Sequence, residues 1–324
     1  MATQITTNAE LQAMNVDPSA DYVLANDLDW SEAEGDFTPV GYLLNPNGLW
    51  SGSFDGQGYT IHNLTIDFTS DFCAGLFGYS STGGSISNLR LVNPAVVGSG
   101  GNFGHVGAIV GVLAAGNISN CCVVGGSVSG YDGAVGGLLG QGGTGTVSNC
   151  YCTADVTCTD GHEAGGISGD TSTVSRCWTS GTISCPSGAA GGIVGFHTTP
   201  RTISDCFSVA TVMADGPVNA GYIANHVTGD TPTNCWWVQQ AGDTATQGTD
   251  AAVLNEETNI SDLFDKTHDV YTAGIAWDFS AGGDWQELNG AFPILAYEPT
   301  PAAADAEMSG IGYAMGMSAH GQDY

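Results

Sequence analysis

One phrase recurs along the middle of this chain, and its spacing limits the possible folds more than any other feature. It opens with a short apolar run bounded by glycine, as in residues 191–195 (GGIVG), and continues with a run such as residues 203–206 (ISDC). The cysteines that end the second run are Cys121, Cys150, Cys177, Cys206 and Cys235. They lie 29, 27, 29 and 29 residues apart. A regular period of this length indicates a stacked repeat architecture.

Each copy of the phrase contains three short runs with strand character. The third run is β-branched, as in residues 181–184 (GTIS). All three are too short for helices and are separated by Gly, Ser and Asn. The pattern predicts an all-β fold: a single right-handed parallel β-solenoid with about 29 residues and three short strands per coil. The Asn of each Ile-x-Asn run is expected at a corner, where Asn63, Asn88, Asn120 and Asn149 would form an amide ladder that Arg176 and Asp205 interrupt.

The combined phrase, Gly-Gly-Leu/Ile-Val-Gly followed by Gly-x-Ile-x-Asn-Cys-Tyr, resembles the GLUG repeat. This repeat is found in bacterial surface and adhesin-type proteins and in some phage-associated proteins. A lead-in at residues 54–61 (FDGQGYTI) and a closing segment around Trp277 and Trp285 extend the resemblance over about residues 4–297. The resemblance implies a β-solenoid scaffold and supplies no catalytic motif.

The repeat divides the chain into four parts. We expect an N-terminal cap with an irregular first coil (1–53), the solenoid repeats (54–240), a C-terminal cap (241–298) and a flexible linker (299–324). Thr7 and Glu10 have the spacing of a helix capping box. Large apolar side chains are expected to plug the C-terminal end of the solenoid: Trp277, Phe279, Trp285, Phe292 and Leu295. A candidate anchoring peptide in the linker contains Met308, Ile311, Tyr313, Met315 and Met317.

The ten cysteines do not have the spacing of a zinc site. The five repeat cysteines would stack as a buried, mostly reduced column, and a linear column cannot converge on a tetrahedral metal. Cys158 and Cys185 occupy matching places in neighbouring coils, two residues after Val156 and Ile183. The expected coil spacing falls within the Cα separation of a disulfide, so this pair is the best candidate for one.

The charge balance limits the partners of the chain. Four basic and 33 acidic residues give a formal net charge of −29, which disfavours nucleic acid and anionic membranes. No apolar run approaches the length of a membrane span, so no membrane insertion is expected. We expect no cofactor beyond weak Ca²⁺ binding. An acidic cluster could hold calcium or form a solvated loop: Asp27, Asp29, Glu32, Glu34 and Asp36.

Acidic residues inside the repeats are scattered, which argues against an enzyme. Asp160, Glu163 and Asp170, near His162, form the best catalytic candidate, and a polysaccharide lyase or glycoside hydrolase is therefore one alternative. The favoured hypothesis is a non-enzymatic structural or display protein. Its rod would be exposed outside the cell or on a virion surface, contacting other subunits of a larger assembly and surface glycans. The start of the chain carries no secretion signal, which tilts the hypothesis toward a virion. A secreted adhesin or filament subunit is the other alternative.

Overall fold

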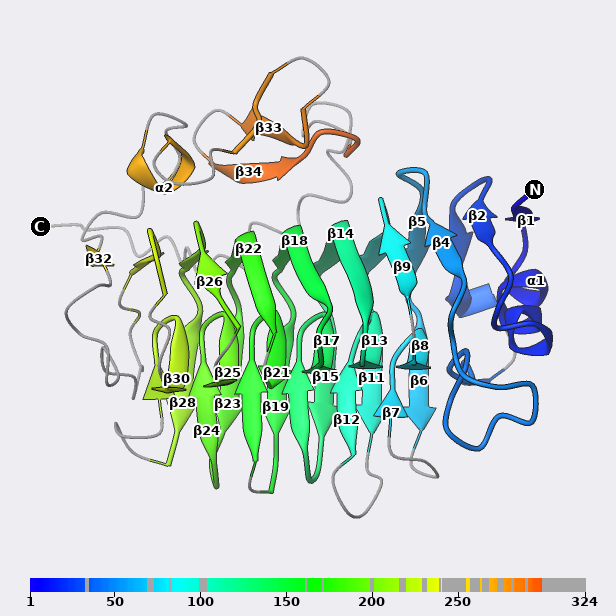
Figure 1. The fold of residues 1–324 in the computed structure, drawn as a ribbon, viewed down its shortest axis with the longest axis horizontal. Coiled ribbons are helices and arrows are strands. Elements are labelled where there is room, and N and C mark those ends of the chain that lie inside the picture. Colours follow the sequence, from blue (N-terminus) through cyan, green and yellow to red (C-terminus); the bar gives the residue numbers. More distant parts are fainter. Residues whose placement is uncertain are drawn as a thin grey trace, which may run out of the picture.

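The computed structural model describes residues 1–32, 35–68, 73–81, 83–98, 104–160, 162–170, 172–198, 201–215, 220–228, 232–238, 240, 255–256, 263, 268–272, 277–280, 283–288 and 291–298. These residues form a parallel β-solenoid whose coils stack along its long axis (Figure 1). The predicted fold class is confirmed, with coils of roughly 29 residues.

Four sheets run along the solenoid. Sheets B, C and D take one strand from each coil that they contain, and sheet A takes either one long strand or two short strands from a coil. Sheet A contains β1 (Thr3–Ile5), β2 (Tyr22–Leu24), β3 (Leu28–Asp29), β4 (Ser53–Asp55), β5 (Thr60–His62), β9 (Gly84–Ser87), β10 (Arg90–Val92), β14 (Gly116–Val124), β18 (Thr146–Cys152), β22 (Thr173–Thr179), β26 (Ile203–Ser204), β27 (Phe207–Ser208), β31 (Trp236–Trp237) and β32 (Asn255–Glu256). Sheet C contains β6 (Thr65–Phe68), β11 (Ala95–Gly98), β15 (Ser127–Gly130), β19 (Asp155–Cys158), β23 (Thr182–Cys185) and β28 (Thr211–Ala214).

The other two sheets contain the glycine-rich half of the repeat. Sheet D contains β7 (Cys73–Ala74), β12 (His105–Gly107), β16 (Ala134–Gly136), β20 (Glu163–Gly165), β24 (Ala189–Gly191) and β29 (Ala220–Gly221). Sheet B contains β8 (Phe77–Ser80), β13 (Val110–Leu113), β17 (Leu139–Gly142), β21 (Ser168–Asp170), β25 (Val194–Thr198) and β30 (Ala224–Thr228). The coil therefore has one strand more than the sequence suggested, because a bend splits the glycine-bounded run into two.

Glycine allows sheets B and D to pack backbone against backbone. A Cβ atom on Gly140 of β17 would lie 2.6 Å from the amide nitrogen of Val106 in β12. One on Gly169 of β21 would lie 2.5 Å from the amide nitrogen of Val135 in β16. Atoms cannot approach so closely without moving the backbone, so the recurrent glycine is a packing requirement at these two positions.

The corner inside the long strands of sheet A is left-handed in coil after coil. Its residues are Asn88, Asn120, Asn149, Arg176, Asp205 and Asn234, with φ between 50° and 55°. Asparagine and aspartate tolerate this conformation better than most residues. Arg176 and Asp205 take part in the coil-to-coil hydrogen bonds here instead of interrupting them, since Arg176 Nε donates to Asn149 Oδ1 at 2.6 Å and Asp205 Oδ1 accepts from Asn234 Nδ2 at 2.9 Å.

Asn63 does not belong to that corner, contrary to the expectation from sequence. It lies at a second left-handed corner, where its Oδ1 accepts from Asn93 Nδ2 at 3.0 Å. Asn63 also donates to Asp29 at 2.9 Å. Two short ladders therefore run along different edges of the first coils.

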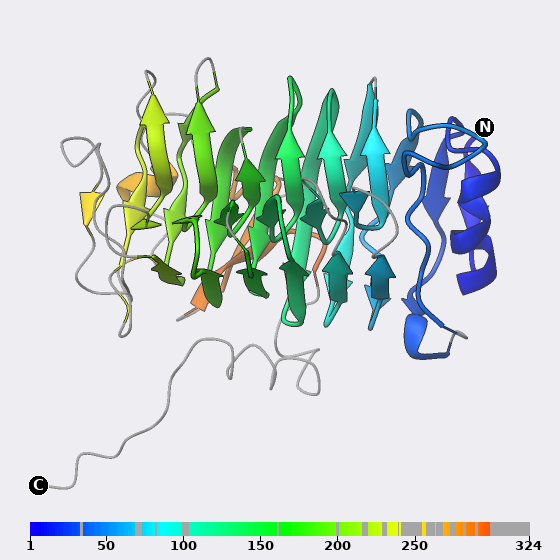
Figure 2. The same cartoon turned by 90° about the horizontal axis from the view of Figure 1, so that it is seen from below.

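The N-terminal end of the solenoid is covered by helix α1 (Asn8–Ala13) and the short 3-10 helix η1 (Met14–Val16) (Figures 1 and 2). The predicted capping box is confirmed: Thr7 Oγ1 accepts from the Glu10 amide, and Glu10 Oε2 accepts from the Thr7 amide. Leu11 and Met14 are fully buried against the first coil. A second 3-10 helix, η2 (Trp30–Glu32), follows β3.

The aromatic residues expected to plug the C-terminal end lie elsewhere. The antiparallel hairpin of β33 (Trp285–Leu288) and β34 (Ala291–Leu295) lies along the flank of the solenoid, beside β14, β18 and β22 (Figure 1). Helix α2 (Asp269–Thr272) lies on the same side. Within the described ranges, no helix has the length and apolar character needed to span a bilayer.

Candidate functional site

The outward face of sheet A carries a row of aromatic side chains. Tyr151, Trp178 and Phe207 hold matching positions in successive coils, and we call them the aromatic stripe. Their ring centroids are 4.6 Å and 5.7 Å apart, with planes within 5° of parallel. Each ring follows a cysteine that points into the core, so strand alternation turns the ring outward. Parallel stacking of this kind contributes about 0.5–1.5 kcal/mol per pair beyond burial.

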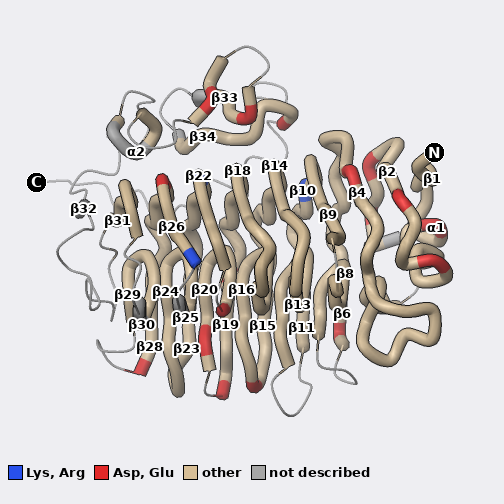
Figure 3. The backbone as a smooth tube through the Cα atoms, viewed as in Figure 1, with Lys and Arg blue, Asp and Glu red and all other residues tan. Residues whose placement is uncertain are grey.

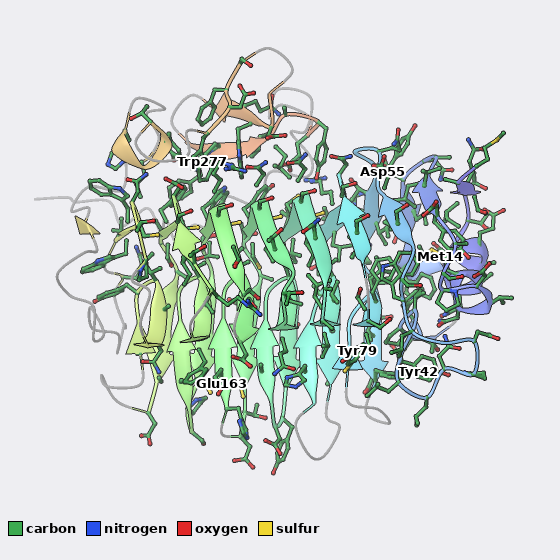
Figure 4. The ribbon with its side chains drawn as sticks, viewed as in Figure 1. Met14, Tyr42, Asp55, Tyr79, Glu163 and Trp277 are labelled. Carbon is green, nitrogen blue, oxygen red and sulfur yellow. The ribbon has the colours of Figure 1, made fainter. Side chains whose placement is uncertain are left out.

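A C-terminal segment covers this stripe. The described residues from Trp277 to Glu298, which include the β33–β34 hairpin, are called the arm. The ring of Phe292 lies 5.1 Å from that of Trp178, and the ring of Trp277 lies 5.9 Å from that of Phe207. Together with the stripe they form a hydrophobic cluster separate from the solenoid core. Figure 4 shows Trp277 above the end of sheet A.

Hydrogen bonds fix the arm in place along the stripe. The indole Nε1 of Trp178 donates to the carbonyl of Pro293 at 3.1 Å. Trp277 Nε1 donates to the carbonyl of Asp205, also at 3.1 Å. These bonds satisfy two indole groups that burial removes from water.

A buried ionic cluster ends the arm. Glu298 Oε2 lies 3.1 Å from Arg90 Nε and accepts a 2.6 Å hydrogen bond from the Tyr151 hydroxyl. Its other oxygen accepts from the Leu295 amide at 2.7 Å. We call Arg90, Tyr151 and Glu298 the latch. Burial raises the pKa of Glu298, while the Tyr151 hydroxyl and Arg90 act in the opposite direction. Burial raises the pKa of the Tyr151 hydroxyl well above its ordinary value, so it remains a donor.

The arm reaches five successive coils. Strand pairing places Arg90, Cys122, Tyr151, Trp178 and Phe207 at one position of the repeat. The latch holds the first of these coils, and the Trp277 contact holds the last. In between, the Tyr297 hydroxyl donates to the carbonyl of Asn120 at 3.0 Å. The arm is therefore a brace that runs along the stack. Sequence reasoning missed this role.

The five repeat cysteines line the interior of sheet A. Cys121, Cys150 and Cys177 are in register, and all five are fully buried free thiols. Each thiol contacts the carbonyl oxygen two residues earlier, at 3.1 to 3.4 Å. Small side chains that donate to a nearby carbonyl suit a tightly stacked interior. Burial raises the pKa of Cys150 and Cys206 well above the ordinary range.

Cys158 and Cys185 end neighbouring strands of sheet C. The register Val156↔Ile183 and Thr157↔Ser184 brings them to matching positions. Both are buried free thiols in the structure. Their sulfur atoms contact the carbonyl oxygens of Gly133 and His162, each at 3.5 Å. The disulfide between them stays a prediction.

The acidic candidate residues lie near the sheet C–D corner, on the opposite side of the solenoid from the arm. Figure 4 places Glu163 at that long edge. Burial, together with Asp170 and Cys158, raises the pKa of Glu163 to about 7. Asp170 accepts a 2.9 Å hydrogen bond from Gln141. Nearby, His162 Nε2 lies 3.1 Å from Asp132 Oδ1. Glu163 can thus hold a proton near neutral pH beside a second carboxyl group.

Asp160 belongs to a different part of this corner. It interacts with the exposed Tyr131, and its hydrogen bond raises the pKa of that phenol. The predicted trio of Asp160, Glu163 and Asp170 is therefore spread over a turn and two sheets. Across the described ranges, three or more His, Cys, Asp or Glu side chains do not gather into a set that could hold a metal ion.

The acidic residues near the N-terminus serve the local fold. Asp27 Oδ1 accepts from the Thr60 amide at 2.7 Å. Asp29 Oδ1 accepts from Ser31 and Asn63, and these hydrogen bonds lower the pKa of Asp29. The side chain of Glu32, residue Glu34 and the anchoring peptide from Met308 to Met317 lie outside the described residues.

Comparisons with known proteins place the fold and give one relative in sequence. No protein-family model matches the chain. The chain is similar to a crystal structure of a candidate immunoglobulin A1 protease from Bacteroides ovatus, with a TM-score of 0.71 over 92% of this chain and 93% of that one. The two sequences are 19% identical, so this likeness concerns the fold alone.

The sequence relative is Halomucin from Haloquadratum walsbyi. It is 34% identical over 173 residues, which are 51% of this chain and 2% of Halomucin. The chain thus corresponds to a small part of a far longer protein.

Proposed function

We propose that this chain is a rigid, non-enzymatic structural or display module of a cell-surface or secreted protein. The contact of the arm with five successive coils is the observation that carries the proposal. Solenoid repeats otherwise touch only their neighbours. A brace along the stack stiffens the rod beyond what neighbour contacts provide, and stiffness is what a spacer or display element requires.

The sequence relative supports a surface or secreted setting. A match to a short stretch of a very long protein fits a module that builds extended chains. The GLUG resemblance agrees with this, although no family model matches. A secreted adhesin or filament subunit is the nearest alternative and needs the same rod. The narrower hypothesis of a virion appendage has no support among the relatives.

The charge distribution fits exposure to solvent. Among the described residues, acidic positions recur over the first coils, along turns of the solenoid and in the arm (Figure 3). A net charge of −29 keeps such a β-rich rod soluble and separates it from neighbouring rods. Contact with anionic partners is correspondingly disfavoured.

A glycan partner, if the rod has one, would not use the aromatic stripe. Sugar rings stack on the open faces of aromatic side chains, but Tyr151, Trp178 and Phe207 turn their faces toward one another. The arm also covers their edges. The outward face of sheet C is the better candidate, with the hydroxyl side chains of Ser129, Thr157 and Ser184 in register.

Surface labelling of cells that produce the chain tests the setting. Antibodies against the folded chain should label intact cells, and external protease should remove the signal. Signal found only after the cells are broken open would overturn a surface or secreted role.

Activity assays separate the enzyme alternative from the proposal. Purified chain should release no reducing ends or unsaturated products from a panel of neutral and acidic polysaccharides. Turnover that disappears in Glu163→Gln and persists in Asp67→Asn, an exposed carboxyl far from Glu163 on sheet C, would overturn the non-enzymatic proposal.

A further inference from the structure

We propose that Cys158 and Cys185 form a redox-active pair that closes into a disulfide between neighbouring coils, while the five-cysteine column stays reduced. This inference goes beyond the role of a structural module. It can hold or fail whatever the chain's setting, because it concerns the purified protein.

The register of sheet C places the two thiols together. Strands β19 and β23 pair Thr157 with Ser184, so the next residues, Cys158 and Cys185, are matched. Parallel neighbours lie about 4.8 Å apart, within the 4.4–6.8 Å that Cα atoms of a disulfide usually span. The flanking coils have Gly130 and Ala214 at the same position. The pair is therefore isolated, with one possible partner for each thiol in its row.

The column cysteines are held differently. Each of them contacts the carbonyl oxygen two residues earlier at 3.1 to 3.4 Å, which points its sulfur along its own strand. The sulfurs of Cys158 and Cys185 contact carbonyl oxygens of the preceding coil at 3.5 Å, and the Cys185 thiol also hydrogen-bonds to Cys158. A disulfide between Cys158 and Cys185 would therefore replace longer sulfur–oxygen contacts than a disulfide within the column would.

The pair also lies closer to solvent than the column. None of these cysteines exposes surface, but protein atoms enclose Cys158 and Cys185 less densely than Cys150 and Cys206. Tyr131, in the corresponding turn of the preceding coil, is 53% exposed.

Thiol acidity supports the pair without singling it out. A hydrogen bond from Cys185 holds the pKa of the Cys158 thiol at about 7, so a thiolate is available near neutral pH. Burial raises the pKa of Cys177, but hydrogen bonds from Cys150 and Cys206 outweigh it and lower that pKa as well. Geometry and access, rather than acidity, distinguish the corner pair.

The reaction needs a hydroperoxide as oxidant. The Cys158 thiolate attacks the outer oxygen and breaks the O–O bond, which leaves a sulfenic acid on Cys158 and releases an alcohol, or water from hydrogen peroxide. The Cys185 thiol then attacks the Cys158 sulfur, loses its proton and releases water. Two thiols and one hydroperoxide give one disulfide, one alcohol and one water. The two electrons pass from sulfur to oxygen.

Thiol counting with peptide mapping tests the proposal. The native, fully reduced chain is treated with hydrogen peroxide, quenched, unfolded without reductant and alkylated. About eight of the ten thiols should then react, and one peptide should join Cys158 to Cys185. Ten alkylated thiols, or a linked peptide from the column, would overturn the proposal.

Three variants make the test specific. Cys185→Ser should trap the Cys158 sulfenic acid, detected by a dimedone adduct, and Cys158→Ser should give no adduct at position 185. Cys150→Ser removes a column thiol and should leave the Cys158–Cys185 link intact. If a variant fails to fold, the map of the unmodified chain still decides the question.

Discussion

Arg90 and Glu298 are 208 positions apart in the sequence, yet Arg90 Nε lies 3.1 Å from Glu298 Oε2. Their side chains are only 6% and 3% exposed. Each coil of a solenoid touches its neighbours alone, so unfolding can begin at any coil. The Arg90–Glu298 pair ties an early coil to the C-terminal arm. The late coils cannot separate from the stack while the arm stays bound.

Breaking the latch should destabilise the whole chain. Glu298→Ala removes the buried carboxylate that contacts Arg90 Nε and accepts from the Tyr151 hydroxyl, so we expect a loss of about 3–5 kcal/mol in the free energy of unfolding. Urea denaturation measures it. The double variant Arg90→Met with Glu298→Leu replaces the pair by apolar side chains and should lie within about 1 kcal/mol of the unmodified chain. A change below about 0.5 kcal/mol in Glu298→Ala would show that the arm does not brace the stack.

At the left-handed corner of sheet A, the stability of the fold should depend on which residue type occupies the position. Asn149 has φ of 52° and both donates to Asp284 and accepts from Arg176. Asn149→Ala loses these bonds and strains the backbone, with an expected cost of about 2 kcal/mol or more. At the equivalent Arg176, φ is 50°. Arg176→Asn suits that conformation and keeps an amide donor, so thermal denaturation should show little change or a gain. A loss in Arg176→Asn as large as that in Asn149→Ala would refute this account.

Glu163 should make stability depend on pH. Its folded pKa of about 7 lies above the ordinary 4.5, so the folded chain holds this proton more tightly than the unfolded chain. Glu163 therefore contributes fully to the free energy of unfolding below pH 4.5, and this contribution is lost as the pH rises through about 7. Glu163→Gln removes that loss. The free energy of unfolding of the variant, relative to that of the unmodified chain, should therefore increase between pH 5 and pH 8.

Urea midpoints at pH 5, 6, 7 and 8 measure this difference. Burial lowers the pKa of His105, which gives stability the opposite pH dependence. Because both chains contain this histidine, its effect cancels in the comparison. Asp67→Asn, at an exposed position, serves as the matched control. Parallel pH curves for Glu163→Gln and the unmodified chain would contradict the prediction.

Salt should stabilise the fold. The net charge of −29 makes the compact state repel itself. The Debye length falls from about 8 Å at 0.15 M to about 3 Å at 1 M salt. The urea midpoint should therefore rise steadily with NaCl and equally with KCl. A larger gain from millimolar CaCl₂ at matched ionic strength would instead reveal specific calcium binding.

The stacked fold was predictable because in-register coils demand the same residue at the same place. Cys121, Cys150 and Cys177 therefore repeat with the coil length. The number of strands per coil was harder to predict. The glycine-bounded run reads as one extended segment, whereas Ala108 and Ile109 form a bend between β12 and β13. Nothing in the composition of that run marks the bend.

The position of the arm could not be read from its own residues. Trp277 and Phe292 signal burial, but hydrophobic burial has no direction, so an end and a flank are equally good destinations. The informative signal lies in the repeats. Tyr151, Trp178 and Phe207 follow inward-facing cysteines and must face outward, which creates a second apolar surface that needs a cover. Arg90 and Glu298 lack any comparable local signal.

The brace also has a consequence for how such a gene can change. Duplicating one repeat in an unbraced solenoid lengthens the rod and alters little else. Here an added coil between Arg90 and Phe207 would move the two ends of the binding surface about 4.8 Å further apart, while the arm from Trp277 to Glu298 kept its length. Either the latch or the Trp277 contact would be lost. The fixed length of the arm therefore matches a fixed number of coils, and selection for its contacts would preserve the repeat number in this part of the chain.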